Sequence, residues 1–254
     1  MSEDIAVPQQ QVSDSSLAVK IHSASEQDLL EAVSSPELTE DLARALFQRR
    51  DLNAAILAAL AENHAALKVR AVIVGLVSHP KTPRHISIPL SRHLFTFELM
   101  QVALQPAVPA DLKMKIEDVL INKMSTISAG ERITLAKRGS TRIAAELLTD
   151  TDPRIVEAAL NNPHMTEAFV AKAITSADST PLLFEFVWRH GKWSLRIDVR
   201  IAMLRAAKTP QHIAMEIVKS MPAVQAKNAL STSRMNAGLK AKLLEEISER
   251  SKAR

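Results

Sequence analysis

The chain has 254 residues, of which 46% are hydrophobic, so it is long and apolar enough to bury a sizeable core. It contains no cysteine, which excludes disulfides, thiol nucleophiles and cysteine-ligated zinc or iron–sulfur sites. The formal net charge of +4 is a weak bias for this length, because dedicated nucleic-acid-binding proteins concentrate positive charge more strongly.

The first 22 residues are rich in serine, glutamine and aspartate and carry few apolar side chains, so we predict that residues 1–22 form a disordered arm. Residues 1–12 lack the basic and apolar regions of a signal peptide. No apolar run reaches the ~18 residues that a membrane-spanning helix needs. From these features we expect a cytoplasmic protein with no membrane partner.

From residue 25 onward, short apolar patterns recur with helical spacing. Alanine and leucine dominate, glycine is scarce, and no convincing alternation of apolar and polar residues indicates a strand. We therefore predict an all-α protein of short helices joined by tight turns. The predicted helices span 25–33, 39–49, 54–62, 68–77, 83–90, 98–104, 110–122, 131–137, 141–148, 154–160, 166–176, 181–189, 196–206, 210–221, 223–229 and 236–251, with a bend at 91–97.

One turn occurs twice. Residues 81–86 read KTPRHI, and residues 208–213, which lie 127 positions later, read KTPQHI. In the first copy, Pro80 directly precedes the motif and predicts the end of the preceding helix. Thr82 predicts a side-chain cap, and Pro83 predicts the start of the next helix. Pro89 is expected to kink or shorten the helix that follows the first copy.

Two further matches share this offset. Residues 36–40 read PELTE and residues 163–167 read PHMTE, while residues 110–113 read ADLK and residues 237–240 read AGLK. Three matches at one offset predict an internal duplication, with pseudo-repeats at 26–126 and 153–251 joined by a helical segment at 127–152. Short helices and self-similarity together predict that residues 23–254 form a single α-solenoid of helical hairpins.

Residues 148–163, which read LTDTDPRIVEAALNNP, resemble a repeat of the HEAT-like group, and especially the leucine-rich repeat variant. Residues 69–83 and 199–210 are weaker copies of the same pattern. The resemblance implies an armadillo-type superhelix over residues 26–250 that acts as a protein-binding scaffold. Some relatives carry an iron–sulfur cluster beside their repeats, but this feature does not carry over because the chain has no cysteine.

We expect neither catalysis nor a bound metal or cofactor. The sequence has no phosphate-binding loop, no dinucleotide-binding glycine pattern and no zinc-protease or serine-hydrolase motif. Its eight histidines are scattered without ligand spacing. Asp150, Asp152 and Glu157 form a carboxylate cluster, but they precede or begin a helix, where negative charge is stabilising.

The basic residues leave an alternative function open, that of a HEAT-like protein that binds nucleic acid or of a DNA repair enzyme similar to the alkylpurine glycosylases. On a solenoid, charges from successive helices can align into a stripe that follows phosphates, as in HEAT-like nucleic-acid-binding proteins and some alkylpurine glycosylases. The principal prediction remains a scaffold that binds another protein, because no dense basic cluster is present. The residues considered for such a stripe are Arg49, Arg50, Lys68, Arg70, Arg84, Arg92, Lys113, Lys115, Lys137, Arg138, Arg142, Arg154, Arg189, Lys192, Arg196, Arg200 and Arg205.

Aromatic residues gather at 184–193, which contains both tryptophans and two of the six phenylalanines. Phe184 and Val187 have core spacing. The two tryptophans stand where the first copy has Ala61 and Ala66, so they either fill a wider groove or flank an exposed binding loop.

The binding-loop hypothesis has Gly191 in a positive-φ turn that ends the helix and presents the following residues at the surface. Tryptophan and arginine are frequent in binding hot spots. The predicted contact patch comprises Trp188, Arg189, His190, Lys192, Trp193, Arg196 and Arg200.

Overall fold

The computed structural model describes residues 9–23 and 25–252, with side chains from residue 16 onward. Over this part of the chain it contains 17 α-helices, two short 3-10 helices and no strand, so the all-α prediction is confirmed. The chain divides into two compact units, unit 1 (Met1–Asn122) and unit 2 (Lys123–Arg254). Each unit is described by itself.

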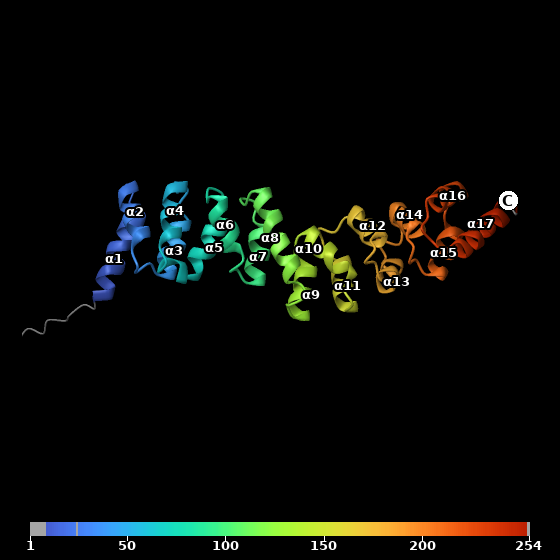
Figure 1. Ribbon diagram of the computed structural model, residues 1–254, viewed down its shortest axis with the longest axis horizontal. Helices are drawn as coiled ribbons and strands as arrows, with labels where there is room; N and C mark the ends of the chain where they lie inside the picture. The colour runs from blue at the N-terminus through green and yellow to red at the C-terminus, as the bar shows by residue number, and fades with distance from the viewer. Residues whose placement is uncertain (1–8, 24, 253–254) are drawn as a thin grey trace, which may run out of the picture. The chain divides into compact units, whose positions relative to one another are not determined.

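Unit 1 is built from eight α-helices and one 3-10 helix within its described residues, and its helices follow one another in chain order in Figure 1. Their bounds are α1 Gln9–His22, α2 Glu26–Ser34, α3 Glu40–Phe47, α4 Ala54–Glu62, η1 Ala66–Lys68, α5 Arg70–Ser78, α6 Arg84–Ser91, α7 Thr96–Leu104 and α8 Ala110–Lys123.

Unit 2 contains nine α-helices and one 3-10 helix within its described residues (Figure 1). Their bounds are α9 Ala129–Arg138, α10 Thr141–Glu146, η2 Leu147–Thr149, α11 Pro153–Leu160, α12 Glu167–Thr175, α13 Pro181–Arg189, α14 Ile197–Arg205, α15 Gln211–Ser220, α16 Ala223–Ser231 and α17 Ala237–Lys252.

The prediction of a disordered arm is wrong for residues 9–22, which form α1, while residues 1–8 lie outside the described part of the chain. Leu17 and Ile21 are spaced by one helical turn and are buried in the unit 1 core, where α1 packs on α2 and α3. Arg49 donates from its guanidinium to the backbone oxygens of Ile21 and Ser23, the second at 2.9 Å. Two apolar residues on one face are enough to dock a segment whose average composition is polar.

Helices pack on the next helix but one. In unit 1, α1 packs on α3, α2 on α4, α3 on α5 and α5 on α7. In unit 2, α9 packs on α11, α10 on α12, α11 on α13, α12 on α14, α13 on α15, α14 on α16 and α15 on α17. Stacked hairpins of this kind bury a continuous row of apolar side chains, and the arrangement within each unit is compatible with an α-solenoid.

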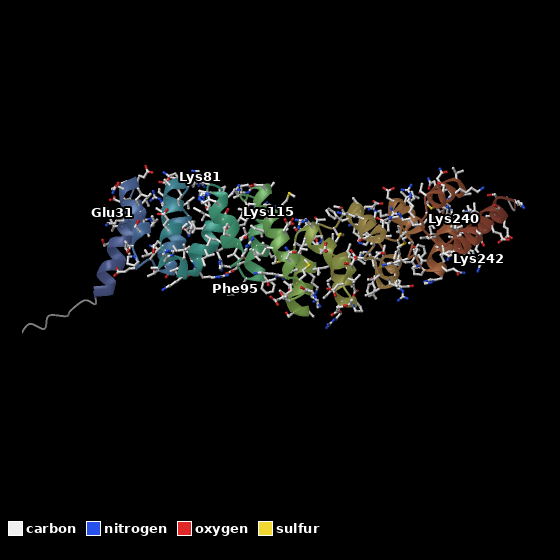
Figure 2. All side chains as sticks on the ribbon, in the orientation of Figure 1. Glu31, Lys81, Phe95, Lys115, Lys240 and Lys242 are labelled. Atoms are coloured by element: carbon white, nitrogen blue, oxygen red, sulfur yellow. The ribbon has the colours of Figure 1, made fainter. Side chains whose placement is uncertain are left out.

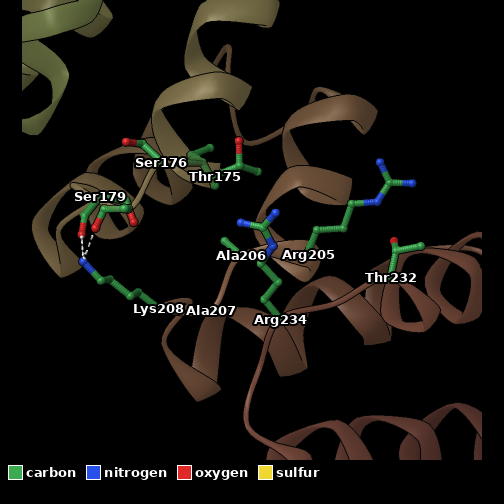
Figure 3. A pocket seen from close by; sticks show the side chains of 11 residues that line it. Thr175, Ser176, Ser179, Arg205, Ala206, Ala207, Lys208, Thr232 and Arg234 are labelled. Atoms are coloured by element: carbon green, nitrogen blue, oxygen red, sulfur yellow. Dashed lines mark hydrogen bonds between the residues drawn. The ribbon is translucent and has the colours of Figure 1, made fainter.

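Side-chain donors reach back to carbonyl oxygens at the ends of the preceding hairpin. Lys81 Nζ lies 2.9 Å from Leu52 O, and Lys208 Nζ lies 3.0 Å from Ser179 O (Figures 2 and 3). Asn63 Nδ2 makes the same kind of contact with Val33 O at 2.9 Å. Leu52 and Ser179 each lie one residue before the N-cap of the following helix, so the repeated lysine of the KTP motif pairs with loop carbonyls that lie outside the helical hydrogen bonds.

The prediction that Thr82 caps the following helix is wrong. Helix α6 has Pro83 at its N-cap position and receives no side-chain cap, and the Thr82 hydroxyl is buried without a hydrogen-bond partner. In the second copy, the Thr209 hydroxyl donates backwards to Met203 O and Ala206 O. The motif threonine lies one residue ahead of the N-cap positions Pro83 and Pro210, so its hydroxyl is not placed to cap the following helix.

Helix bounds recur at the spacing of the sequence matches. The start and end of α4 return 127 positions later in α13, and the same spacing relates α5 to α14 and α7 to α16. Helix α6 has 8 residues, whereas its counterpart α15 has 10. Pro89 lies in α6, so the shorter helix agrees with the expected effect of an internal proline.

Candidate functional site

The aromatic segment forms α13 and the turn that leads into α14. Thr180 caps α13 by accepting from the backbone N–H of Leu183 at 3.3 Å, and Pro181 occupies its first turn. Phe184 and Val187 are fully buried, which confirms their predicted core positions. Phe184 and Val187 thus anchor the buried face of α13, and the exposed side chains of the segment are the ones that a partner can contact.

Trp193 is buried, with 1% of its surface exposed, so the prediction that it projects at the surface is wrong. Its indole N–H donates to Leu160 O at 2.9 Å. The ring centroids of His190 and Trp193 lie 6.1 Å apart. No described residue has a positive φ, Gly191 included. Helix α13 instead ends in an extended His190, with φ −75° and ψ 123°, and the following turn places the indole inward.

Trp188 is half-buried and connects three helices. Its indole N–H donates to Glu216 Oε2 of α15 at 3.0 Å, and the guanidinium carbon of Arg200 in α14 lies 5.9 Å from its ring centroid. Arg200 also donates through Nε to Ser194 O at 2.6 Å. Trp188 and Arg200 therefore hold neighbouring elements together and expose only part of their surfaces.

His190 uses both ring nitrogens. Nδ1 accepts from the backbone N–H of Lys192 at 3.1 Å, so Nε2 carries the proton of the neutral ring and donates to Asn161 Oδ1 at 3.2 Å. Burial lowers the pKa of His190 below its ordinary value, the nearby Lys192 cation lowers it further, and Glu157 acts in the opposite direction. The ring is held neutral and serves as a connector.

Arg189 is exposed and forms an ion pair with Glu185 at 3.4 Å on the same helix. Glu185 also lies 2.9 Å from Nε2 of His212, at the start of α15. Arg189 and His212 therefore share one carboxylate, and Arg189 contributes little free charge to the surface.

The residues that do face solvent include two that the sequence prediction missed. Leu195 is 71% exposed and Ile197 is 43% exposed, and they alternate with the exposed cations Lys192 and Arg196. We call residues 191–197 the apolar–basic turn. Sequence patterns assign apolar residues of a helical protein to the core, so the exposure of Leu195 and Ile197 was missed. The one signal of exposure was that the residues 127 positions earlier, Lys68 and Arg70, are charged.

Hydrogen bonds fix the apolar–basic turn in place. The Ser194 hydroxyl donates to His190 O at 2.8 Å, and the Arg196 N–H donates to Trp193 O at 3.1 Å. Lys192 lies over the Trp193 ring, with Nζ 4.0 Å from the centroid. The buried tryptophan therefore acts as the anchor that holds Leu195 and Ile197 outward.

The corresponding region of unit 1 is built differently. Arg70 forms an ion pair with Glu98, donates to His93 O at 3.0 Å, and places its guanidinium 3.9 Å from the Phe95 ring centroid. Phe95 remains 67% exposed at the start of α7 (Figure 2). Unit 1 thus neutralises its cation at this position, whereas unit 2 replaces it with Ile197.

The carboxylate cluster has structural partners. Asp152 caps α11 by accepting from the Arg154 N–H at 2.9 Å, and hydrogen bonds from the Arg154 side chain lower the pKa of Asp152. Asp150 pairs with Arg132 at 3.1 Å. Among the described residues, no group of three or more histidine, aspartate or glutamate side chains is placed to hold a metal ion. A membrane-spanning helix is likewise not found within the described ranges.

The chain matches no protein-family model, no curated protein and no solved structure.

Proposed function

We propose that this protein is a non-catalytic binding module built from HEAT-like helical repeats, and that the apolar–basic turn of unit 2 is its contact surface for another protein. The stacking of alternate helices within each unit supports the solenoid, and the recurrence of helix bounds supports its origin by duplication. The resemblance of residues 148–163 to the leucine-rich repeat variant supports the same assignment.

The observation that carries the proposal is the exposure of Leu195 and Ile197 on a turn that is fixed from below by Trp193. A turn whose backbone is already ordered loses little further backbone entropy when a partner covers it, so less of the affinity from apolar burial is lost to ordering. Burying such a side chain stabilises a complex by about 1.5–3 kcal/mol.

The chemistry of the turn defines the partner. Lys192 precedes the apolar pair, Arg196 lies between its two members, and Asp198 follows in the first turn of α14. The cations exceed the carboxylate by one, so the surface fits a protein segment that combines apolar residues with acidic residues. Electrostatic attraction of this kind steers encounter and orients the partner.

A nucleic-acid-binding function has less support because many of the basic side chains have partners within the chain. Arg70 pairs with Glu98, Arg84 pairs with Asp111 at 2.7 Å, and Lys81 donates to Leu52 O. A cation that is already neutralised releases few counterions from a phosphate backbone.

The test is affinity capture with the full chain and two variants. The double substitution Leu195→Glu/Ile197→Glu removes the apolar surface and introduces charges that repel an acidic segment. Val19→Glu in α1 is the matched control, because Val19 is as exposed as Leu195, at 71%. We expect one protein to be retained by the wild type and by Val19→Glu and to be lost with the double variant, followed by at least tenfold weaker binding of that purified protein.

Retention of the same proteins by all three chains contradicts the proposal. Binding to duplex DNA that weakens steeply with salt, and that is unaffected by Leu195→Glu/Ile197→Glu, supports the nucleic-acid alternative instead.

A further inference from the structure

A cleft of about 610 Å³ lies within unit 2, at the C-terminal ends of α12 and α14 (Figure 3). Its cationic lining consists of Arg205 at the end of α14, Lys208 in the following turn and Arg234 ahead of α17. Thr175 and Thr232 add hydroxyl groups. None of the residues that line it is an aspartate or a glutamate.

Cations near a helix C-terminus often pair with the free carbonyls there, but several carbonyls of this region already have other donors. Lys208 donates to Ala177 O at 2.6 Å and to Ser179 O at 3.0 Å. Arg205 O accepts from the backbone N–H of Arg234 at 2.9 Å. The hydroxyl of Thr209 donates to Met203 O and Ala206 O.

The guanidinium groups of Arg205 and Arg234 are therefore not needed for these carbonyls. Both residues are exposed, and neither side chain has an ion pair or a hydrogen bond within the described residues. In Figure 3 they come from different segments, with Arg234 extending past Ala206 and Arg205 on the side of Thr232. Two unneutralised cations in one concave site attract an anion.

Unit 1 shows that the helical framework forms without these arginines. The positions 127 residues earlier are Ser78 and Ala107, while the lysine is kept as Lys81 and makes the same backward hydrogen bond to Leu52 O. Lysine belongs to the framework, whereas the two arginines are additions specific to unit 2.

We propose that this cleft binds a phosphate-bearing small molecule, with Arg205 and Arg234 as its main ligands. The planar guanidinium group donates two parallel hydrogen bonds to a phosphoryl group, and two such groups suit a ligand with two phosphoryl groups. The volume is within the range of about 300–1,000 Å³ that is typical of small-molecule sites. The hydroxyls of Thr175 and Thr232 also line the wall, but they donate to carbonyl oxygens of their own helices, so the two guanidinium groups are the donors available to the ligand.

The test is calorimetric titration of the full chain at low salt with sodium pyrophosphate, and with inorganic phosphate in a second arm. We expect saturable binding of one pyrophosphate, tighter than that of phosphate. The double variant Arg205→Gln/Arg234→Gln is expected to bind at least tenfold more weakly. Arg138→Gln is the matched control, because Arg138 is also an exposed arginine at the end of a helix in unit 2 but does not line the cleft.

Titration without saturation, or an equal loss of affinity in Arg138→Gln, overturns the proposal and indicates general attraction to a basic surface. Unchanged affinity in the double variant overturns it as well. A third titration with a phosphoserine peptide distinguishes the sources of the phosphoryl group, since a preference for the peptide over pyrophosphate assigns the group to a partner protein. If Leu195→Glu/Ile197→Glu binds pyrophosphate with the same affinity as the wild type, the cleft binds its ligand independently of the proposed protein-binding surface.

Discussion

Trp193 is the residue on which the apolar–basic turn depends. Its side chain is buried beside α11, and its indole N–H pairs with Leu160 O. We expect Trp193→Ala to lower the free energy of unfolding by about 3–5 kcal/mol, because it leaves a large cavity and an unpaired carbonyl. Trp193→Phe keeps most of the packing and is expected to cost less. Urea unfolding followed by circular dichroism measures both.

The control for this prediction is Trp188→Ala, which removes the same side chain from a half-buried site. It is expected to cost less than Trp193→Ala. An equal cost for the two variants contradicts the anchoring role of Trp193.

His190 makes the stability of unit 2 depend on pH. Its pKa is lowered, chiefly by burial and also by Lys192, so the unfolded chain takes up a proton near pH 6.5 while the folded chain stays neutral. The stabilisation is complete above the unfolded pKa and is lost as pH falls toward the folded pKa. We expect the urea midpoint to decrease between pH 7.5 and pH 5.5, and to decrease less in His190→Gln.

His79 in unit 1 has a pKa lowered by burial and by Lys81, so part of the pH dependence remains in His190→Gln. Combining His79→Gln with His190→Gln is expected to flatten the profile further. If the urea midpoint of His190→Gln depends on pH as steeply as that of the wild type, His190 does not contribute to the pH dependence.

The candidate site was partly predictable from the sequence. Phe184 and Val187 have core spacing and are buried. The environment of Trp193 depends on one backbone conformation, the extended His190, which the sequence does not determine because glycine at position 191 permits a left-handed turn equally well. The exposure of Leu195 depends on the same turn, so the two errors share one cause.

At the scale of elements, the repeated KTP motif offers a matched pair of mutations. The Thr209 hydroxyl donates to two carbonyls at the end of α14, whereas the Thr82 hydroxyl is buried without a partner. We expect Thr209→Val to lower the free energy of unfolding by about 1–2 kcal/mol, since it leaves buried carbonyls with one donor fewer. Thr82→Val is expected to be neutral or stabilising. Equal effects in chemical denaturation contradict this assignment.

Helix positions were more predictable than helix ends. The predicted ranges 54–62 and 181–189 coincide with α4 and α13. Helix α9 begins at Ala129 rather than at the predicted Glu131, because Ser128 and Glu131 form a reciprocal capping box that encloses Gly130. The predicted helix starts after Gly130, since glycine favours turns when no cap is considered.

At the scale of the whole molecule, the two compact units make a prediction about folding. Unit 1 and unit 2 each pack alternate helices on one another, and the boundary at Asn122 falls at the end of α8. Each unit is compact and buries apolar side chains of its own, so a fragment that contains one unit keeps that core. We expect fragments 1–126 and 127–254 each to be helical and to melt cooperatively by circular dichroism.

A cut between residues 179 and 180 is the control, because it also falls in a loop but separates α12 from α14 and α11 from α13. It uncovers the fully buried side chains of Val170 and Ile174 on one piece and of Val199 and Met203 on the other. Each exposed side chain of this size forfeits about 1.5–3 kcal/mol of burial, so fragment 180–254 is expected to melt at a lower temperature than fragment 127–254. Fragments 1–126 and 127–254 that become helical only when mixed contradict the independence of the two units.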